Sequence, residues 1–324
     1  MLPCRALFIL SVLMLALAHP AAAETYPARP VTLVAPYAAG GGADLIARLM
    51  AQKLGERLGR ASVVENRLGA GGVIAASSVA KAAPDGYTLF MGTSTQLAIQ
   101  VTLHKSLPYD PAADFVPIAL LASVPFVLIV HPSLPVHSVT DLIHLAKAKP
   151  GQLSFGSSGV GGPPHLFTEL LKTMTGIEMT HIPYKGTAQA MTDVVAGHVP
   201  LIFSDLAPAI PLLRDGKLRA LGISSAVRFT GLPDIPPIAE TVPGFDAVAW
   251  LALVAPAGTP GEIVDKLHEE VKAIMATPDV QQRFVDLGNI PLVSPSVAEL
   301  QRYVKSEIVR WGKVVEKAGL AGSE

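Results

Sequence analysis

The sequence predicts an α/β fold of two lobes, in which each lobe is a mainly parallel sheet flanked by helices. Short apolar runs bounded by turn residues alternate with amphipathic stretches, which is the pattern that α/β units produce. The length of 324 residues exceeds the size at which a single hydrophobic core usually stops growing. Two proline-containing stretches, 124–135 and 232–245, have the composition of connections, and we expect the chain to cross between the lobes there.

The apolar runs locate the strands in order along the chain. Most of those before residue 223 are separated from the next by one helical stretch, as in a sheet whose strands run parallel. The expected strands are residues 31–35, 62–65, 88–91, 126–130, 153–156, 199–203, 218–223 and 249–255.

Several of the expected helices carry start signals in the sequence. Thr259, Pro260 and Glu262 fit a capping box with proline at the first helical position. Ser296 and Glu299 fit a second capping box. The apolar residues of this last helix recur at spacings of three and four, which predicts a face that packs against the rest of the protein.

The N-terminal residues 1–23 predict a secretory signal peptide. Arg5 precedes an apolar run over 6–18, and the small residues 21–23 supply an A-x-A site, so we expect cleavage after Ala23. The apolar run is too short to cross the hydrocarbon region of a bilayer. The mature chain is therefore expected to be a soluble, exported protein.

The composition argues against several kinds of partner. The chain has 25 basic and 26 acidic side chains, so it has no excess of positive charge that would attract a nucleic acid. The one cysteine, Cys4, lies in the segment that is expected to be removed, so the mature chain has no disulfide and no thiolate metal ligand. The nine histidines form no H-E-x-x-H motif, and we expect neither a metal nor a cofactor.

The stretch VAPYAAGGGAD, residues 34–44, runs from an apolar strand through three glycines into an amphipathic helix. A helix that begins in this way presents unpaired N–H groups and the positive end of its dipole, with no side chain between them and a ligand. Gly40, Gly41, Gly42 and Ala43 are therefore expected to hold an anion through the backbone.

Three other expected strands end in a similar way. GSSGVGGPPHL, residues 156–166, places glycines and the hydroxyls of Ser157 and Ser158 before a helix with proline in its first turn. MGTST, residues 91–95, and FSDL, residues 203–206, are two further polar strand ends. Since open α/β sheets bind ligands at the carboxyl ends of their strands, these segments predict one shared ligand cleft.

Nucleotide-binding and catalytic motifs fit these turns poorly. The first turn reads G-G-G-A-D-L in place of G-x-G-x-x-G, and no set of glycines is followed by the Walker lysine. Ser157, Ser158, His165 and Asp205 supply the residue types of a serine hydrolase, but GSSG is one residue short of the G-x-S-x-G elbow. His165 is more simply a ligand-facing or capping side chain, and we expect no catalytic residue.

Two acids and a lysine near these turns have alternative roles. Asp44 lies in the first turn of its helix, where capping is favoured over contact with the ligand. Asp205 fits equally well as a cap of the next helix and as a partner for a ligand's ammonium or hydroxyl group. Lys185, in the turn IPYKGT, is either solvated or placed to assist an anion.

Several sequence blocks, in order, resemble one known family. YPARPVTLVAPYAAGGGADLIARLM, HIPYKGTAQAMTDVVAGHV, APAGTP and RWGKVVEKAGL are similar to segments of the extracytoplasmic solute-binding proteins of tripartite tricarboxylate transporters, the Bug family. The resemblance runs from Tyr26 to Leu320, which is nearly the whole mature chain. It implies a type II-like periplasmic-binding-protein fold, in which two lobes close on a solute.

The resemblance also implies lobe boundaries and contact residues. Lobe 1 would contain residues 24–124 and 245–324, and lobe 2 would contain residues 125–244. The ligand would be a small organic acid or acidic amino acid, held largely by backbone N–H groups, hydroxyls and water. By motif position its contacts would be Ala39, Gly41, Gly42, Ala43, Asp44, Thr93, Ser94, Ser157, Ser158, Gly159, Gly162, His165, Ser204 and Asp205.

The sequence departs from the family pattern at three places. Leu206 stands where members usually have asparagine after the aspartate, and Pro163 with Pro164 replaces a polar or small pair. Leucine and alanine follow Trp250, where a glycine is common. Two of these changes adjoin the expected cleft, so the identity of the ligand does not follow from the relatives.

These inferences combine into one expected function. The chain would be a monomeric periplasmic solute-binding protein that captures a small carboxylate by hinge closure and delivers it to membrane permease subunits. A ligand-sensing periplasmic module that signals to a membrane partner is one alternative. A serine-dependent hydrolase is a second and less favoured alternative.

Overall fold

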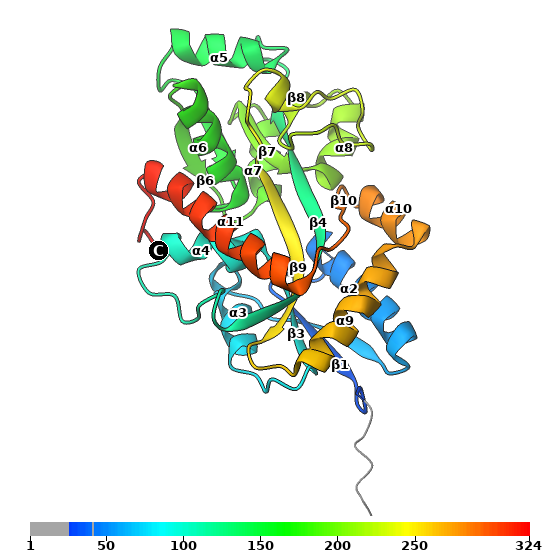
Figure 1. The fold of residues 1–324 in the computed structure, drawn as a ribbon. Helices are drawn as coiled ribbons and strands as arrows, with labels where there is room; N and C mark the ends of the chain where they lie inside the picture. The colour runs from blue at the N-terminus through cyan, green and yellow to red at the C-terminus, as the bar shows by residue number, and fades with distance from the viewer. Residues whose placement is uncertain (1–25, 41) are drawn as a thin grey trace, which may run out of the picture.

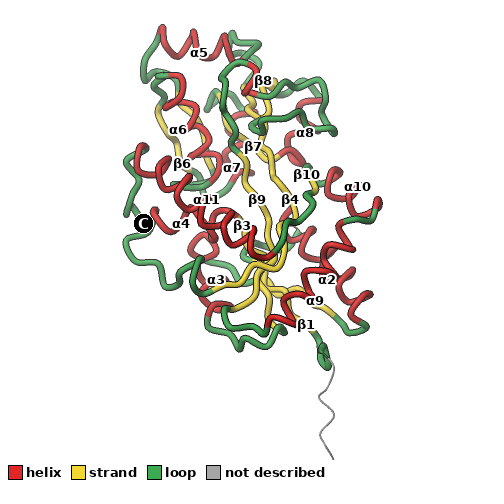
Figure 2. The backbone as a smooth tube through the Cα atoms, in the orientation of Figure 1, coloured by secondary structure: helices red, strands yellow, loops and turns green. Residues whose placement is uncertain are grey.

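The computed structural model describes residues 26–40 and 42–324. The expected signal peptide, its cleavage site and Gly41 lie outside these residues. The fold is α/β, with helices packed around a curled, mixed sheet (Figures 1 and 2). None of the helices formed by the described residues is both long and apolar enough to span a bilayer.

The strands agree with the expected ones in most places. Two short strands, β6 and β10, were not expected, and β4 begins eleven residues before the expected position, at Phe115 rather than Phe126. The strands are β1 (Val31–Ala35), β2 (Ser62–Asn66), β3 (Thr88–Thr93), β4 (Phe115–Val130), β5 (Ser154–Ser157), β6 (Thr180–Pro183), β7 (Leu201–Asp205), β8 (Arg219–Ile223), β9 (Val248–Pro256) and β10 (Ile290–Pro291).

The helices follow most strands directly. Three short segments, η1 (Ala70–Gly72), η2 (Thr95–Ile99) and η3 (Ile238–Glu240), are 3-10 or π helices. The α-helices are α2 (Gly42–Leu58), α3 (Val73–Ala80), α4 (Gln100–Leu103), α5 (Val139–Ala148), α6 (Pro163–Thr175), α7 (Thr187–Val195), α8 (Leu206–Arg214), α9 (Gly261–Met275), α10 (Pro278–Asp286) and α11 (Val297–Lys317).

The sheet consists of two parts that share β4. The first part has the order β2-β1-β3-β9-β4, with β10 also beside β4, and the second has the order β4-β7-β5-β6, with β8 also beside β4. The outer strands pair in parallel, β1 with β2 and β3, and β5 with β6 and β7. Strands β4 and β9 pair antiparallel with each other, and β3, β7 and β8 pair antiparallel with one or the other of them.

Strand β4 carries the chain from one part of the sheet to the other (Figure 1). Its residues 115–125 pair with β9, and its residues 126–130 pair with β7 and β8. The chain passes between the two parts of the sheet within the expected stretch 124–135, and residues 124–130 do so as part of the strand, of which 126–130 were expected. Pro117 is accommodated at an irregularity in the register, and Pro125 lies where the strand changes partners, so neither interrupts a regular ladder.

Helix α11 packs on the junction and holds it through one buried carboxylate. Glu307 Oε2 accepts hydrogen bonds from the indole N–H groups of Trp250 and Trp311, at 2.9 and 3.0 Å. Trp250 belongs to β9, whereas the ring of Trp311 stacks on Phe167 of α6, with ring centroids 5.6 Å apart. One apolar cluster consequently extends from β3 through the junction to α6.

The start signals of two helices have different outcomes. The capping box of Ser296 and Glu299 is confirmed at the beginning of α11. The box predicted for Thr259 and Glu262 is wrong, because α9 begins at Gly261 with Pro260 as its N-cap. The Thr259 hydroxyl donates instead to the carbonyl oxygen of Pro256, at 2.8 Å, and so closes the preceding turn.

Candidate ligand-binding site

The carboxyl ends of the parallel strands form two edges where the predicted contact residues gather. Because β1, β2 and β3 run parallel, their ends bring the turns after residues 35, 66 and 93 to one edge. Because β5, β6 and β7 run parallel, their ends bring the turns after residues 157, 183 and 205 to another. Binding sites of α/β proteins lie at such edges.

The turn between β1 and α2, which we call the first turn, is held by the carboxylate of Asp44. This side chain is buried, and it accepts hydrogen bonds from the Gly40 N–H at 2.9 Å, Arg48 Nε at 2.8 Å and Asn66 Nδ2 at 2.7 Å. Burial alone would raise the pKa of Asp44, but the hydrogen bonds from Arg48, Asn66 and Gly40 outweigh it and hold the pKa below its usual value. The carboxylate therefore has a structural role within the turn.

The end of β3 joins the first turn through a polar network. Thr93 Oγ1 lies 2.8 Å from Gln96 Oε1 and 3.1 Å from the Tyr37 hydroxyl. Gln96 Nε2 donates to the Gly71 carbonyl oxygen at 2.7 Å. The neighbouring hydroxyl, Ser94 Oγ, is buried and has no hydrogen-bond partner among the described residues. Burying such a hydroxyl without a partner costs about 1 to 3 kcal/mol.

The loop before α3 contributes to this edge and was missed by the sequence reasoning. Residues 69–72 all have positive φ, and Ala70, with φ 46°, is the one non-glycine residue of this kind in the described part of the chain. A Cβ atom at Gly72 would lie 2.5 Å from Gln96 Nε2, so the close approach requires glycine there. The glycine-rich sequence LGAGG before a helix was the available signal.

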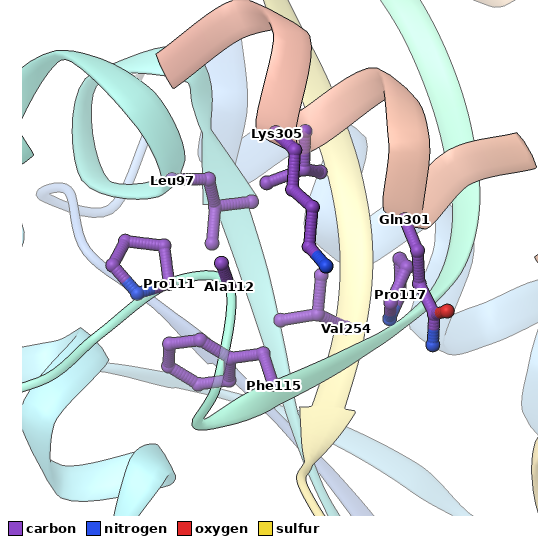
Figure 3. Close-up of a pocket in the computed structure, with 9 residues that line it drawn as sticks. Leu97, Pro111, Ala112, Phe115, Pro117, Val254, Gln301 and Lys305 are labelled. Carbon is purple, nitrogen blue, oxygen red and sulfur yellow. The ribbon is translucent and has the colours of Figure 1, made fainter. Parts of the chain in front are cut away.

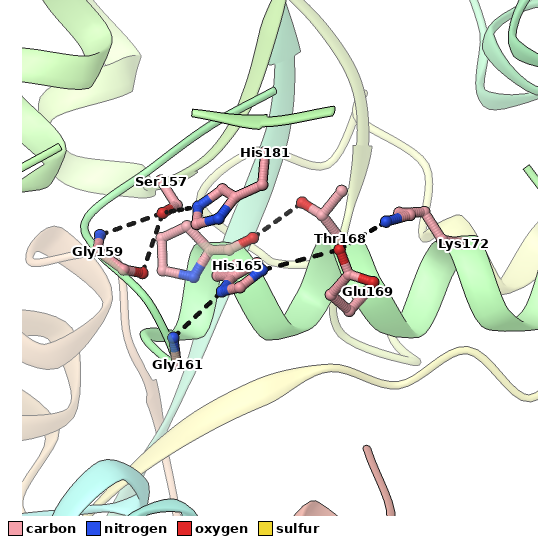
Figure 4. Close-up of polar contacts among 9 residues, drawn as sticks. Ser157, Gly159, Gly161, His165, Thr168, Glu169, Lys172 and His181 are labelled. Carbon is pink, nitrogen blue, oxygen red and sulfur yellow. Dashed lines mark hydrogen bonds and ion pairs between the residues drawn. The ribbon is translucent and has the colours of Figure 1, made fainter. Parts of the chain in front are cut away.

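The turn between β5 and α6, which we call the second turn, is held by uncharged groups (Figure 4). The buried Ser157 hydroxyl donates to the Gly159 carbonyl oxygen at 3.0 Å and accepts from the Gly159 N–H at 3.1 Å. It also lies 2.6 Å from His181 Nε2. The hydroxyl has one proton, so when it donates to Gly159 the imidazole N–H is the donor of this contact. His181 belongs to β6 and was not predicted, because it is 24 residues from Ser157 in the sequence.

His165 holds the same turn from inside α6. Its Nδ1 accepts the N–H of Gly161, the residue before the N-cap Gly162, at 3.1 Å, so the side chain holds the turn that precedes the helix. Its ring stacks on His181, with centroids 3.6 Å apart and planes at 13° (Figure 4). Burial lowers the pKa of His165 to about 3 and that of His181 to about 4, and the charge of Lys172 acts in the same direction. Both rings are neutral at physiological pH.

The end of β7 has an acidic side chain that caps no helix. Asp205 is the N-cap residue of α8, yet its side chain makes no capping hydrogen bond, so the capping interpretation is wrong. Burial raises the pKa of its carboxyl group. The neighbouring Ser204 hydroxyl is buried, and its one proton has two acceptors within reach, Met191 Sδ and the Asp205 carbonyl oxygen. Leu206, one of the departures from the family pattern, is buried in an apolar cluster.

The remaining predicted contact residues are at least partly accessible. Ala39 and Gly42 are exposed, and intermediate exposure is found for Ala43, Ser158, Gly159 and Gly162.

Helix α4 contacts loops at both strand-end edges. Gly161 of the second turn has φ +67°, and a Cβ atom there would lie 2.3 Å from Leu103 Cδ2. Leu103 ends α4, and one turn earlier Gln100 Nε2 donates to the Gly71 carbonyl oxygen of the first edge. Helix α4 therefore touches the strand-end loops of both parts of the sheet.

Two hollows lie near these elements. One of about 550 Å³ lies at the end of β6 and is lined by Pro183, Tyr184, Lys185 and Gln189, which include none of the predicted contact residues. A smaller one of about 130 Å³ lies between α11 and the segment before β4, and its lining includes none of the predicted contact residues (Figure 3). Seven of its nine lining residues are apolar, and Gln301 and Lys305 of α11 are the polar ones. In residues 26–40 and 42–324, no three metal-ligating side chains are grouped to hold a metal ion.

Comparison with known proteins gives matches along most of the chain. Residues 46–320 match the model of the TctC family, described as the tripartite tricarboxylate transporter family receptor. The chain is 37% identical over 305 residues to Protein BugT of Bordetella pertussis, a match that covers 94% of this chain and 93% of that protein.

Solved structures give the same result. The structure described as R. palustris Rpa4515 with adipate has a TM-score of 0.82 and 43% identity, covering 91% of this chain and 99% of that one. The structure of MatC (Rpa3494) from Rhodopseudomonas palustris with bound malate has a TM-score of 0.77 and 36% identity, covering 90% and 100%. The periplasmic binding protein BugD has a TM-score of 0.79 and 35% identity, covering 91% and 99%.

The fold and the strand-end turns define a solute-binding receptor. The chain shares its fold with the periplasmic binding protein BugD and with the R. palustris protein with adipate, and its helix-opening turns gather at strand ends, where α/β proteins bind ligands. The chain belongs to the tripartite tricarboxylate transporter receptor family, also called the Bug family. The resemblance seen in the sequence is thereby confirmed.

Proposed function

We propose that this chain is an exported receptor that binds a small organic carboxylate and delivers it to the membrane subunits of a tripartite tricarboxylate-type transporter. The observation that carries the proposal is the 43% identity to the R. palustris protein with adipate, over 91% of this chain. The relative with bound malate, at 36% identity, supports the same class of ligand. Both compounds are short dicarboxylates, and we propose a dicarboxylate as the ligand.

The ligand's negative charge would be met by backbone N–H groups at the strand ends. No arginine lies in the predicted contact segments, and the Asp44 carboxylate has its hydrogen bonds within its own turn. The exposed Gly42 begins α2, where free N–H groups and the helix dipole favour an anion. Hydrogen bonds to a charged group are worth about 1.5 to 3 kcal/mol each, so a few of them are compatible with micromolar affinity, about 8 kcal/mol.

Capture would proceed by closure of two lobes about the crossing strands. The proposed lobes are residues 24–124 with 245–324, and residues 125–244. Two observations support these boundaries: β4 changes its partners between Pro125 and Phe126, and the returning strand β9 begins at Val248. A ligand that contacts both strand-end edges would favour the closed arrangement through contacts that only this arrangement makes.

The geometry around Ser157 supports binding in preference to catalysis. Its hydroxyl is fully buried and is engaged by Gly159 and His181, whereas a nucleophile must reach its substrate. We therefore propose a protein that releases its ligand unchanged.

The proposal extends to location and assembly. Cleavage after Ala23 would release a soluble monomer into the periplasm. The related protein BugD is described as a periplasmic binding protein. Mass spectrometry of the protein secreted from a bacterial host would test the cleavage site, and sedimentation analysis would test the monomer.

A calorimetric and thermal-shift screen tests the proposed ligand class. The purified mature chain is titrated with dicarboxylates of four to six carbons, including malate and adipate, with citrate, glutamate and an uncharged diamide as comparisons. A dicarboxylate at 100 times its dissociation constant is expected to raise the free energy of unfolding by about 2.7 kcal/mol. A flat response to all the acids would contradict the proposal and favour the sensory alternative. Chemical conversion of a bound acid, abolished by Ser157→Ala, would favour the hydrolase.

A further inference from the structure

The stacked histidines form the support of the second turn. His181 contacts the Ser157 hydroxyl, which itself makes two hydrogen bonds with Gly159. His165 accepts the Gly161 N–H. Three alternate positions along the backbone, 157, 159 and 161, are consequently held by a pair of rings that lie 3.6 Å apart.

The contact of His165 requires one protonation state. An imidazole nitrogen accepts a hydrogen bond only when it carries no proton, so Nδ1 is unprotonated while it bonds to the Gly161 N–H. A proton added at Nδ1 would place two donors 3.1 Å apart, and the turn would have to move. The ring must therefore be neutral, with its proton on Nε2.

The surroundings of the pair disfavour a positive charge on either ring. Phe155 stacks on His181, with ring centroids 5.0 Å apart, and His165 is buried whereas His181 is partly exposed. The charged groups that face the pair are Glu169 and Lys172, both from α6. They bond to each other at 2.7 Å, and Glu169 Oε1 lies 3.8 Å from His165 Nε2. The carboxylate thus faces the nitrogen that carries the proton in the neutral ring.

We propose that His165 and His181 are positioning residues that, as neutral imidazoles, keep the second turn in the shape that binds the carboxylate, so that gain of a proton by either ring weakens capture. This inference rests on the proposed function. It assigns to His165 a role behind the turn, in place of the direct ligand contact that the motif position implied. Gly161, which His165 holds, is also the residue that contacts Leu103 across the two edges.

Substitutions that keep or remove the accepting atom test the role of His165. In His165→Asn the amide oxygen takes the place of Nδ1, whereas His165→Leu offers no acceptor. Affinity for the dicarboxylate that binds wild type best is measured by calorimetry at neutral pH. We expect His165→Asn to stay within about threefold of wild type and His165→Leu to bind at least about tenfold more weakly, about 1.4 kcal/mol.

A buried histidine elsewhere provides the matched control. His268 is also buried, and its Nδ1 lies 2.7 Å from the Ile118 carbonyl oxygen, away from the strand-end edges. His268→Leu is expected to lower the melting temperature with no change in affinity. Equal affinity of His165→Leu and wild type would overturn the proposal. So would a loss in His165→Asn as large as that in His165→Leu, because the accepting atom would then be irrelevant.

A pH series separates the histidines from the titration of the ligand itself. The dissociation constants of wild type and of His165→Asn/His181→Gln are measured with the same ligand, so protonation of the ligand cancels in their ratio. The ratio of the wild-type dissociation constant to that of the double variant is expected to be constant from about pH 7.5 to 5.5. Because the pKa values of the two histidines are about 3 and about 4, this ratio is expected to rise about fivefold by about pH 3.5. Far-UV circular dichroism identifies the pH range in which both proteins remain folded. A ratio that stays constant over this folded range below about pH 4.5 would overturn the pH dependence.

NMR of protein labelled with ¹⁵N-histidine provides a readout that does not depend on binding. His165 is expected to carry its proton on Nε2 at neutral pH. A proton on Nδ1 would overturn the assigned hydrogen bond. Absence of binding of any carboxylate to wild type would instead contradict the proposed function, and the NMR result would still decide the state of the pair.

Discussion

The first and second turns both lead from a parallel strand into a helix, but they are stabilised by different chemistry. In the first turn a carboxylate, Asp44, gathers donors from Gly40, Arg48 and Asn66. In the second turn neutral imidazoles hold the backbone, directly at Gly161 and through the Ser157 hydroxyl. The comparison shows that a charged and an uncharged support can serve the same backbone arrangement.

The surroundings explain why each turn has its own solution. The charge on Asp44 is tolerated because its partner Arg48 has a half-exposed side chain, which leaves the guanidinium in contact with water. His165 has only 5% of its side chain exposed and stacks on another ring, so a charge there would be poorly solvated. Neither support places a free charge at the strand ends.

The largest expected difference between the turns is the loss on removing Asp44. Asp44→Ala deprives three donors of their acceptor, and we expect the free energy of unfolding to fall by about 3 kcal/mol. Urea denaturation at neutral pH measures this loss. The matched control is Asp279→Ala, because Asp279 pairs with Lys53 on the surface with 67% of its side chain exposed, and no measurable loss is expected. Equal losses in the two variants would show that the buried network contributes nothing special.

A smaller effect is expected at the contact between the second turn and α4. Gly161→Ala combines a left-handed backbone with a clash against Leu103, and we expect it to destabilise the protein by about 2 kcal/mol. Adding Leu103→Ala should recover the steric share of this loss, which a double-mutant cycle measures. Gly42→Ala is the control in the first turn, because a Cβ there meets no atom within 4 Å and stability should change by less than about 0.5 kcal/mol. Additive effects at 161 and 103 would contradict the contact.

The pH dependence of stability should distinguish the two supports. His165 has a lowered pKa, so below about pH 6.5 the unfolded chain binds a proton that the folded chain does not, and stability falls as the pH falls. The share of the slope that comes from His165 is at most about 1.4 kcal/mol per pH unit between about pH 6 and 4. His165→Asn should remove this share and leave that of His181, whose pKa is also lowered. The pKa of Asp44 is lowered, so the stability that its carboxylate contributes is lost only at more acidic pH. Urea midpoints measured from neutral to acidic pH test this, and identical slopes in wild type and His165→Asn would contradict it.

Local sequence patterns predicted much of the fold and the position of the turns. Strand β1 and the start of α2 were found because an apolar run and a glycine cluster are signals contained within about ten residues. The capping box at Ser296 was found for the same reason. The box at Thr259 failed, because the competing turn with Pro256 depends on how β9 ends.

The polar partners in the turns could not be predicted in this way. Tyr37 and Thr93 are 56 residues apart, and Gln96 and Gly71 are 25 apart, yet each pair is in contact. The extension of β4 was also missed, since prolines within a run indicate a connection until the partner strand β9 is known.

The sequence by itself determined where strands end in glycines and where helices begin, because these features depend on the conformational freedom of a few neighbouring residues. Only the tertiary structure decided which side chains hold each turn. The carboxylate of Asp44 and the rings of His165 and His181 obtain their protonation states from burial and from partners on other elements. Burial and such partners exist only after the sheet has brought distant segments together.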